Sequence, residues 1–183
     1  FNNGHSRHVN NLIEGKINEK EVKIFDYSYT IGSGKNKTTY RFNIAEIVFK
    51  YQLPLIVLTE KTGLFNMTPD IDVEKNPVKL QLEGDFNKFF NLETEKEFEI
   101  EVLQIFTPDL MNDLCDKWKH LSLETTDDRL YIYENKMADN TDELETFVKL
   151  AKRLTSQIDQ VGNSLSKDVS SLREAITRNT KNE

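Results

Sequence analysis

The chain has 183 residues, and its 24 lysines and arginines against 31 aspartates and glutamates give a formal net charge of −7. An acidic balance argues against binding through phosphates, so no nucleic-acid partner is expected. Its one cysteine, Cys115, excludes an intramolecular disulfide framework. No apolar run approaches the roughly 18 residues of a membrane-spanning helix. The hydrophobic fraction of 37% is patterned along the chain, which predicts a folded domain of mixed α and β structure.

The first 20 residues are polar and are expected to form a short turn or helix before the first strand. No basic segment followed by an apolar stretch and a cleavage site marks a signal peptide. Because the chain begins with Phe1 and not with methionine, we expect a processed or trimmed piece of a longer protein. Any membrane anchor would then lie upstream of Phe1.

Alternation of aromatic and β-branched residues predicts a strand over residues 22–31. A glycine-containing break at 32–36 and a second alternating run at 38–44 predict a hairpin. Residues 53–58 are apolar on both faces and predict a covered strand. Residues 78–82 alternate again, whereas 100–106 fit either a strand or the approach to a helix. One face of the first strand carries an aromatic row, Phe25, Tyr27 and Tyr29.

Two helices carry start signals. Thr107 is a typical N-cap residue, and it is followed by Pro108 at the first helical position and an acidic residue in the first turn. Asn140, with Glu143 three residues later, predicts the start of a longer helix by a capping box. Between them, apolar runs on either side of Asp127 and Asp128 predict a second hairpin.

The long C-terminal helix is predicted to carry an apolar stripe that begins at Leu144 with alternating steps of three and four. Two successive steps of four around Leu165 form a stutter, which locally unwinds a coiled coil without ending it. In one interpretation, the first half packs on the sheet and the rest frays after Gly162, a poor helix former. In the other, the distal seam pairs with a helix of a second copy or of a partner. Its candidate contact residues are Leu165, Val169, Leu172 and Ile176.

The candidate chemical groups have simple structural explanations. His5 and His8 lack a third ligand nearby, so they are expected to be solvated and no metal site is predicted. The run from Gly32 to Lys35 lacks the spacing and the following helix of a phosphate-binding loop, which favours a hairpin turn. Cys115 falls on the apolar face of the Thr107 helix, where thiols are usually inert.

An acidic loop could offer carboxylates to Ca²⁺, although the ligand spacing and turn glycine of an EF-hand are missing, and a solvated loop is the preferred interpretation. Its members are Asp70, Asp72 and Glu74. Motifs of serine, zinc and paired-cysteine enzymes are absent from the sequence. The sequence therefore predicts no catalytic residue, no cofactor and no metal.

Several stretches together carry a family resemblance. They are residues 22–30 with the following Gly-Ser-Gly-Lys turn, 53–55, 86–90, 105–111 and 130–133. The chain resembles a family of uncharacterised bacterial proteins that is frequent in reduced-genome, candidate-phylum bacteria. Its members carry hydrophobic membrane segments ahead of a soluble domain that opens with a Phe-x-x-Gly stretch like residues 1–4. The resemblance covers roughly residues 1–136, implies a membrane-associated protein and supplies no functional residue.

Together these features predict an α+β domain over residues 1–138, followed by a long C-terminal helix over 139–183 that is a possible coiled coil in its distal half. We expect an antiparallel or mixed sheet of about five to seven strands packed by helices. The leading functional hypothesis is a non-enzymatic, membrane-anchored domain in protein–protein interaction, with a partner or self-association through the C-terminal helix. The alternative is a small-ligand or lipid-binding domain in which Phe25, Tyr27 and Tyr29 line a pocket. A hydrolase built from scattered acids is a third possibility.

Overall fold

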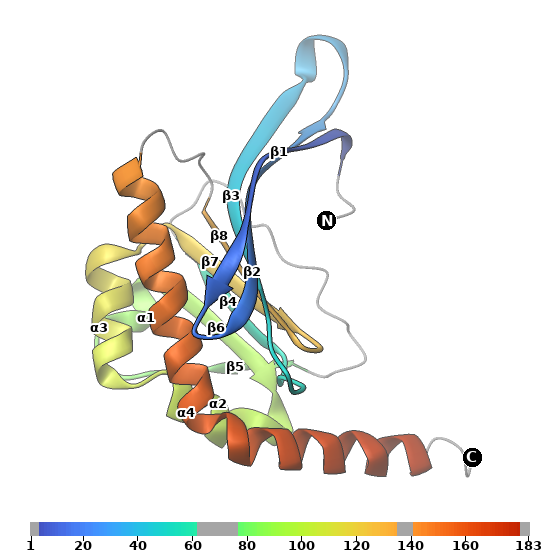
Figure 1. Cartoon of the computed structure of the whole chain (residues 1–183), viewed down its shortest axis with the longest axis vertical. Coiled ribbons are helices and arrows are strands. Elements are labelled where there is room, and N and C mark those ends of the chain that lie inside the picture. The colour runs from blue at the N-terminus through green and yellow to red at the C-terminus, as the bar shows by residue number, and fades with distance from the viewer. Residues whose placement is uncertain (1–3, 62–76, 135–140, 180–183) are drawn as a thin grey trace.

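The protein, described by a computed structural model, is an α+β domain in which helices cover one face of an antiparallel sheet (Figure 1). The structure describes residues 4–61, 77–134 and 141–179, with the side chains of the last helix described as far as Gly162. These residues form a sheet of eight strands in the order β1-β2-β3-β8-β7-β4-β6-β5. The strands are β1 (His5–Ile17), β2 (Lys20–Ile31), β3 (Thr38–Val48), β4 (Ile56–Glu60), β5 (Pro77–Leu80), β6 (Phe90–Glu95), β7 (Leu121–Thr126) and β8 (Arg129–Glu134).

The expectation of five to seven strands is wrong, and β1 shows why. Along β1 only Ile17 is buried, because this strand lies at the sheet edge and pairs with β2 alone. An exposed edge strand buries neither face, so it lacks the hydrophobic alternation from which a strand is predicted. The polar N-terminal segment is therefore a strand and not the expected turn or short helix. Strand β6 is likewise a strand that the sequence did not predict.

The helices are α1 (Phe86–Phe89), α2 (Glu99–Ile105), α3 (Pro108–Lys117) and α4 (Thr141–Asn179). Residues 100–106, which fitted either a strand or a helix, belong mainly to α2. The predicted start of α3 is confirmed, because the Thr107 side-chain oxygen accepts a hydrogen bond from the Leu110 backbone N–H at 3.4 Å. The helix predicted from Asn140 is confirmed as α4, while Asn140 itself lies outside the described residues.

Both predicted hairpins are confirmed, as β2–β3 and β7–β8. Asp127 occupies the turn of the second hairpin with a φ of 53°, a left-handed conformation that aspartate tolerates. In the first hairpin, β3 pairs with β8 only from Asn43 onward, so its first residues are paired with β2 alone. Strands β1 to β3 therefore reach beyond the layer of helices (Figure 1).

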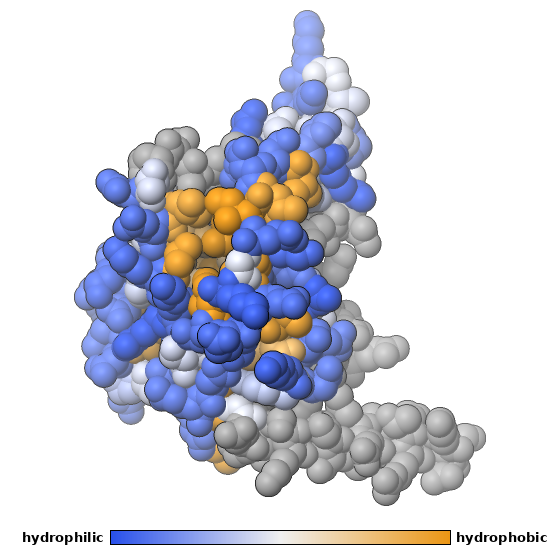
Figure 2. Space-filling view, in the orientation of Figure 1, coloured by the Kyte–Doolittle hydropathy of each residue, from blue (hydrophilic) through white to orange (hydrophobic). Residues whose placement is uncertain are grey.

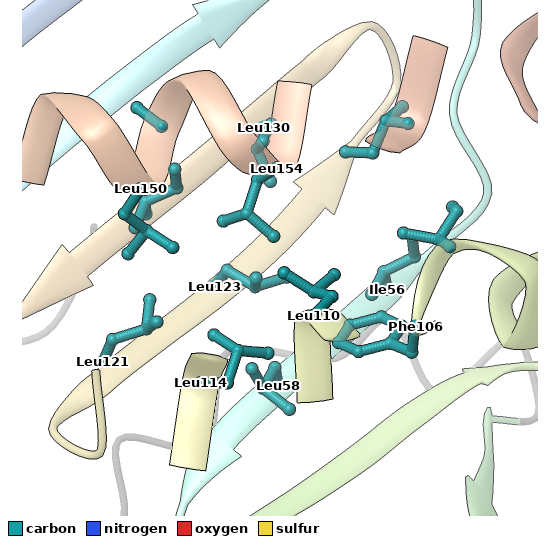
Figure 3. Packing of buried hydrophobic residues seen from close by; sticks show 14 of the residues in the cluster. Ile56, Leu58, Phe106, Leu110, Leu114, Leu121, Leu123, Leu130, Leu150 and Leu154 are labelled. Atoms are coloured by element: carbon teal, nitrogen blue, oxygen red, sulfur yellow. The ribbon is translucent and has the colours of Figure 1, made fainter. Parts of the chain in front are cut away.

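The main core lies between the sheet and the helices. Leu150 and Leu154 of α4 point toward the β7–β8 hairpin, and Leu110 and Leu114 of α3 pack near strand β4 (Figure 3). All four leucines are fully buried. Burying a leucine side chain stabilises a fold by about 1.5–3 kcal/mol, so this layer of leucines is the main support for the helices.

Helix α4 consists of two parts with different surroundings. Its proximal half, residues 141–162, packs on the sheet through a buried stripe. Its distal half, residues 163–179, remains helical and points away from the sheet (Figure 1). The buried residues of the proximal half are Phe147, Leu150, Ala151, Leu154, Ile158 and Val161. We call the sheet, α1 to α3 and the proximal half of α4 the body of the protein.

Candidate functional site

The turn between β1 and β2 holds the proximal half of α4. Asn18 and Glu19 both have positive φ, 48° and 62°, as the two central residues of a tight hairpin turn with left-handed geometry require. The Asn18 side-chain amide donates hydrogen bonds to the Lys152 carbonyl oxygen at 3.3 Å and to the Ser156 hydroxyl at 2.9 Å. The edge hairpin is thereby fastened to a helix that lies more than a hundred residues later in the sequence.

An ion pair lies next to this turn. The Lys20 ammonium is 2.5 Å from a carboxylate oxygen of Asp159, and it also lies 4.9 Å from the centre of the Phe49 ring. The Lys20 side chain is 11% exposed and that of Asp159 is 35% exposed, so the pair is only partly hydrated. The second carboxylate oxygen of Asp159 accepts a hydrogen bond from the Tyr51 hydroxyl at 2.8 Å. Burial, helped by the bond to Asp159 and its charge, raises the pKa of Tyr51.

The ring of Tyr51 covers Gly162, the last residue of the proximal half. A Cβ atom at this position would lie only 2.5 Å from the Tyr51 Cζ atom, so glycine permits the close approach. Helix α4 changes direction in this region and then leaves the body (Figure 1). We call Asn18, Lys20, Tyr51 and Asp159 the α4 junction, because together they fix the end of the proximal half.

The candidate contact residues all fall beyond this junction. The backbone of the distal half is helical, which differs from the interpretation that the helix frays after Gly162. The side chains of its candidate residues lie outside the described ones. These residues are Leu165, Val169, Leu172 and Ile176. Their backbone belongs to a single helix, and the apolar face that they would share remains a prediction from their spacing.

The predicted aromatic row lies on the sheet face opposite the helices. Tyr27 and Tyr29 are buried and Phe25 is half-buried. The Tyr29 ring stacks on Tyr40 and Phe42 of the neighbouring strand, with ring centres 5.2 and 5.9 Å apart. The row is therefore part of a larger aromatic cluster on β2, β3 and β8, whose half-buried members are Phe25, Tyr40 and Tyr131.

Exposed apolar side chains gather on β1 and on α2. Val9, Leu12 and Ile13 on the edge strand are 56%, 54% and 48% exposed. Ile100 and Leu103 on α2 are also exposed. Figure 2 shows an apolar area on the face of the molecule that carries α4 and β1. Single exposed apolar residues are ordinary, whereas a group of them on one face is typical of a binding surface.

The chemically reactive residues lie apart from one another. The His5 ring lies 2.8 Å from the Gly32 carbonyl oxygen, whereas the His120 ring lies 2.9 Å from the Glu60 carboxylate in another part of the sheet. Cys115 packs at the margin of the core, where burial raises the pKa of its thiol. Among the described side chains, those of residues 4–61, 77–134 and 141–162, no three His, Cys, Asp or Glu groups gather as metal ligands.

Two other predicted sites have different outcomes. The Gly32 to Lys35 segment belongs to the hairpin connection between β2 and β3, which confirms the predicted turn. Asp70, Asp72 and Glu74 lie outside the described residues. No helix in the described part of the chain is long and apolar enough to span a membrane.

Sequence reasoning missed the α4 junction. Lys20 and Asp159 are 139 residues apart in the chain, and Tyr51 and Asp159 are 108 apart. Neither pairing has a local spacing signal, because both depend on how the edge hairpin and α4 meet in space. Only the turn at Asn18 and Glu19 has a recognisable local signal, since asparagine favours left-handed turns.

Comparisons with known proteins show the fold alone. No family model matches the chain, and no curated protein matches it. The crystal structure of the mycobacterial trehalose monomycolate transport factor A, TtfA, superposes with a TM-score of 0.57 and a sequence identity of 8%. The match covers 84% of this chain and 74% of the TtfA chain. At this identity, the similarity supports a shared architecture and transfers no residue role.

The α4 junction yields a prediction about stability. Replacing Lys20 or Asp159 by alanine should lower the free energy of unfolding by about 1–3 kcal/mol, since each leaves a partly buried polar partner unpaired. A double-mutant cycle in urea should give a coupling energy of about 1 kcal/mol. The matched control is the Glu145–Lys149 pair of the same helix, which is 3.7 Å apart with both side chains more than 60% exposed. A coupling for Lys20 and Asp159 no larger than that of the control would contradict a stabilising junction.

Proposed function

We propose that the chain is a non-catalytic domain of a membrane-associated protein, and that it acts by contacting another protein through the distal half of α4. The single observation that carries this proposal is the division of α4. Its proximal half packs on the sheet through a buried stripe, whereas its distal half continues as a helix away from the sheet. An apolar stripe on a helix with no sheet beneath it is stabilised when another element covers it.

The sequence of the distal half supports a contact role. Its apolar positions, Leu165, Val169, Leu172 and Ile176, follow steps of four, three and four, so they fall on one helical face. Most of the stability of a protein helix comes from packing of its apolar face, so contact of this stripe with another element would stabilise the distal half. The proposed partner is a protein helix, and no nucleic acid is included because the chain carries a net charge of −7.

The assignment as non-catalytic rests on the separation of reactive groups. Among the described residues, His5, His120 and Cys115 lie in different parts of the fold and have ordinary local partners or surroundings. Membrane association is proposed from the family resemblance alone, which implies membrane segments upstream of the domain. A domain tethered in this way would present the distal half of α4 near the membrane surface without inserting its acidic body.

The distal contact face can be tested with paired charge substitutions. Leu165→Asp with Leu172→Asp should abolish the contact, because two carboxylates on the apolar face would have to be desolvated at an interface. The control is Ser170→Asp with Thr177→Asp, which adds the same charges at the same seven-residue spacing on a different face of the helix. Equilibrium ultracentrifugation detects contact with a second copy, and affinity capture with the purified chain detects a foreign partner.

The two pairs should behave differently. The protein with Ser170→Asp and Thr177→Asp should keep the association state and the partners of the wild-type chain. The protein with Leu165→Asp and Leu172→Asp should be a monomer that binds no partner. A wild-type chain that sediments as a monomer and captures no partner would contradict the proposal. Equal behaviour of the two substituted proteins would contradict it as well.

A second candidate function is the binding of an apolar ligand such as a lipid. It is favoured by the similarity to a trehalose monomycolate transport factor, since a mycolate ester is a lipid. The aromatic cluster offers a surface for such a ligand. Its half-buried members, Phe25, Tyr40 and Tyr131, form its partly accessible margin, next to the buried Tyr27 and Tyr29.

Titration with a fluorescent fatty acid tests this candidate. Phe25→Ala should weaken binding about tenfold or more, because it removes a large apolar contact from the margin of the cluster. The matched control is Ile100→Ala on α2, a 69% exposed apolar residue on the other side of the sheet, which should leave binding unchanged. Absence of saturable binding to the wild-type chain, or equal loss in the two variants, would contradict a ligand site on the aromatic cluster.

A further inference from the structure

The apolar stripe of α4 changes its phase where the helix leaves the body. Up to Leu165 the stripe alternates steps of three and four, and its members as far as Val161 are buried against the sheet. Two successive steps of four, from Val161 to Leu165 and from Leu165 to Val169, then shift the stripe around the helix. Such a shift separates two seams on one helix. The second seam begins at the bend beside Tyr51 and Gly162, where the sheet no longer lies beneath it (Figure 1).

The residue types of the second seam are those of a parallel, two-stranded coiled coil. In a seven-residue repeat with core positions a and d, Val169 and Ile176 occupy a, and Leu165 and Leu172 occupy d. β-Branched residues at a combined with leucine at d favour two parallel strands, because their side chains fit the packing of a parallel dimer. The residue types of the seam therefore favour two helices that run in parallel.

The charges beside the seam agree with this arrangement. In a parallel pair, a residue at position g faces the position e that lies five residues later in the partner helix. By sequence position Asp168 falls at g and Arg173 at e, so a parallel, in-register pair would bring these two opposite charges together. Two-fold symmetry forms this pair twice. The remaining charged residues of the repeat, Lys167 and Glu174, occupy the outer position f and do not bear on the choice of partner.

We propose that the partner of the distal half of α4 is a second copy of this chain, bound in parallel and in register. This inference rests on the proposed contact function and names its partner. Because α4 leaves the body at the start of the seam, a parallel pair brings both bodies to the same end of the coiled coil. Four core layers make a short interface, so the dimer should be weak in dilute solution. A shared membrane anchor would strengthen it by raising the effective concentration to the order of 1 mM.

Disulfide cross-linking tests direction and register. The experiment uses the full chain with Cys115→Ser, which removes its one native cysteine. Leu165→Cys in this background should form a covalent dimer with itself, because equivalent d positions meet in a parallel pair. Ser170→Cys, at the outer position b, is the control and should not cross-link.

The opposite direction gives a different result. In an antiparallel pair aligned on the same seam, position 165 meets position 176. A link that formed only between Leu165→Cys chains and Ile176→Cys chains, and not within either, would overturn the parallel arrangement. In that case the distal half of α4 would still be the contact element, so the proposed function would stand.

Exchange of the two charged residues tests the proposed Asp168–Arg173 pairs without changing the apolar core of the coiled coil. Asp168→Arg and Arg173→Asp should each weaken self-association about three- to tenfold in sedimentation equilibrium, since each places like charges across both symmetric pairs. The double exchange should restore the wild-type dissociation constant. A double exchange as weak as the single ones would overturn the assigned register.

The experiments separate two outcomes: a distal half that does not bind a second copy, and a distal half that binds no protein at all. A chain that stays monomeric at about 1 mM would overturn the dimer. If that monomer binds a different protein and loses it on Leu165→Asp with Leu172→Asp, the contact function stands with another partner. If it binds none, both proposals fail.

Discussion

The fold depends on the contact between the proximal half of α4 and the sheet. This half buries its apolar stripe over the β7–β8 hairpin, and Leu150, Ala151 and Leu154 are fully buried there. The α4 junction completes the contact, because Asp159 accepts bonds from both Lys20 and Tyr51. The body has enough sheet to cover only one half of a 39-residue helix. Among the described elements, the distal half consequently has no sheet beneath it.

This constraint connects the architecture to the proposed function. A helix that is fixed at one end by a partly buried ion pair and extends from the body has a defined direction, which lowers the entropy lost on binding. The phase change of the apolar stripe falls at the same place as the change in surroundings, next to Gly162. The two halves of α4 thus have separate partners in our account: the sheet for the first and a second copy of the chain for the other. The similarity to TtfA concerns the architecture and leaves lipid binding as a second, separately testable candidate.

Local signals predicted much of the fold. The N-cap at Thr107, the turn at Asp127 and the two faces of β2 all depend on neighbouring residues, and the structure confirms them. Strand β1 could not be predicted in this way, because an exposed edge strand is defined by its hydrogen bonds to β2 and not by burial. The α4 junction was missed for a related reason, since Lys20 and Asp159 meet only after the edge hairpin has packed beside α4. The distal contact face was predicted from spacing, and its side chains lie outside the described ones.

Hydrogen exchange measured at several protein concentrations tests the central claim most directly, because it reports the protection of each half of α4 separately. Our account predicts that amides of residues 144–161 are protected at every concentration, since the sheet buries that half within one chain. Amides of residues 165–176 should exchange rapidly in dilute solution and become protected as concentration rises. Protection of the distal half that did not depend on concentration, or rapid exchange at every concentration even with a partner protein present, would contradict the account.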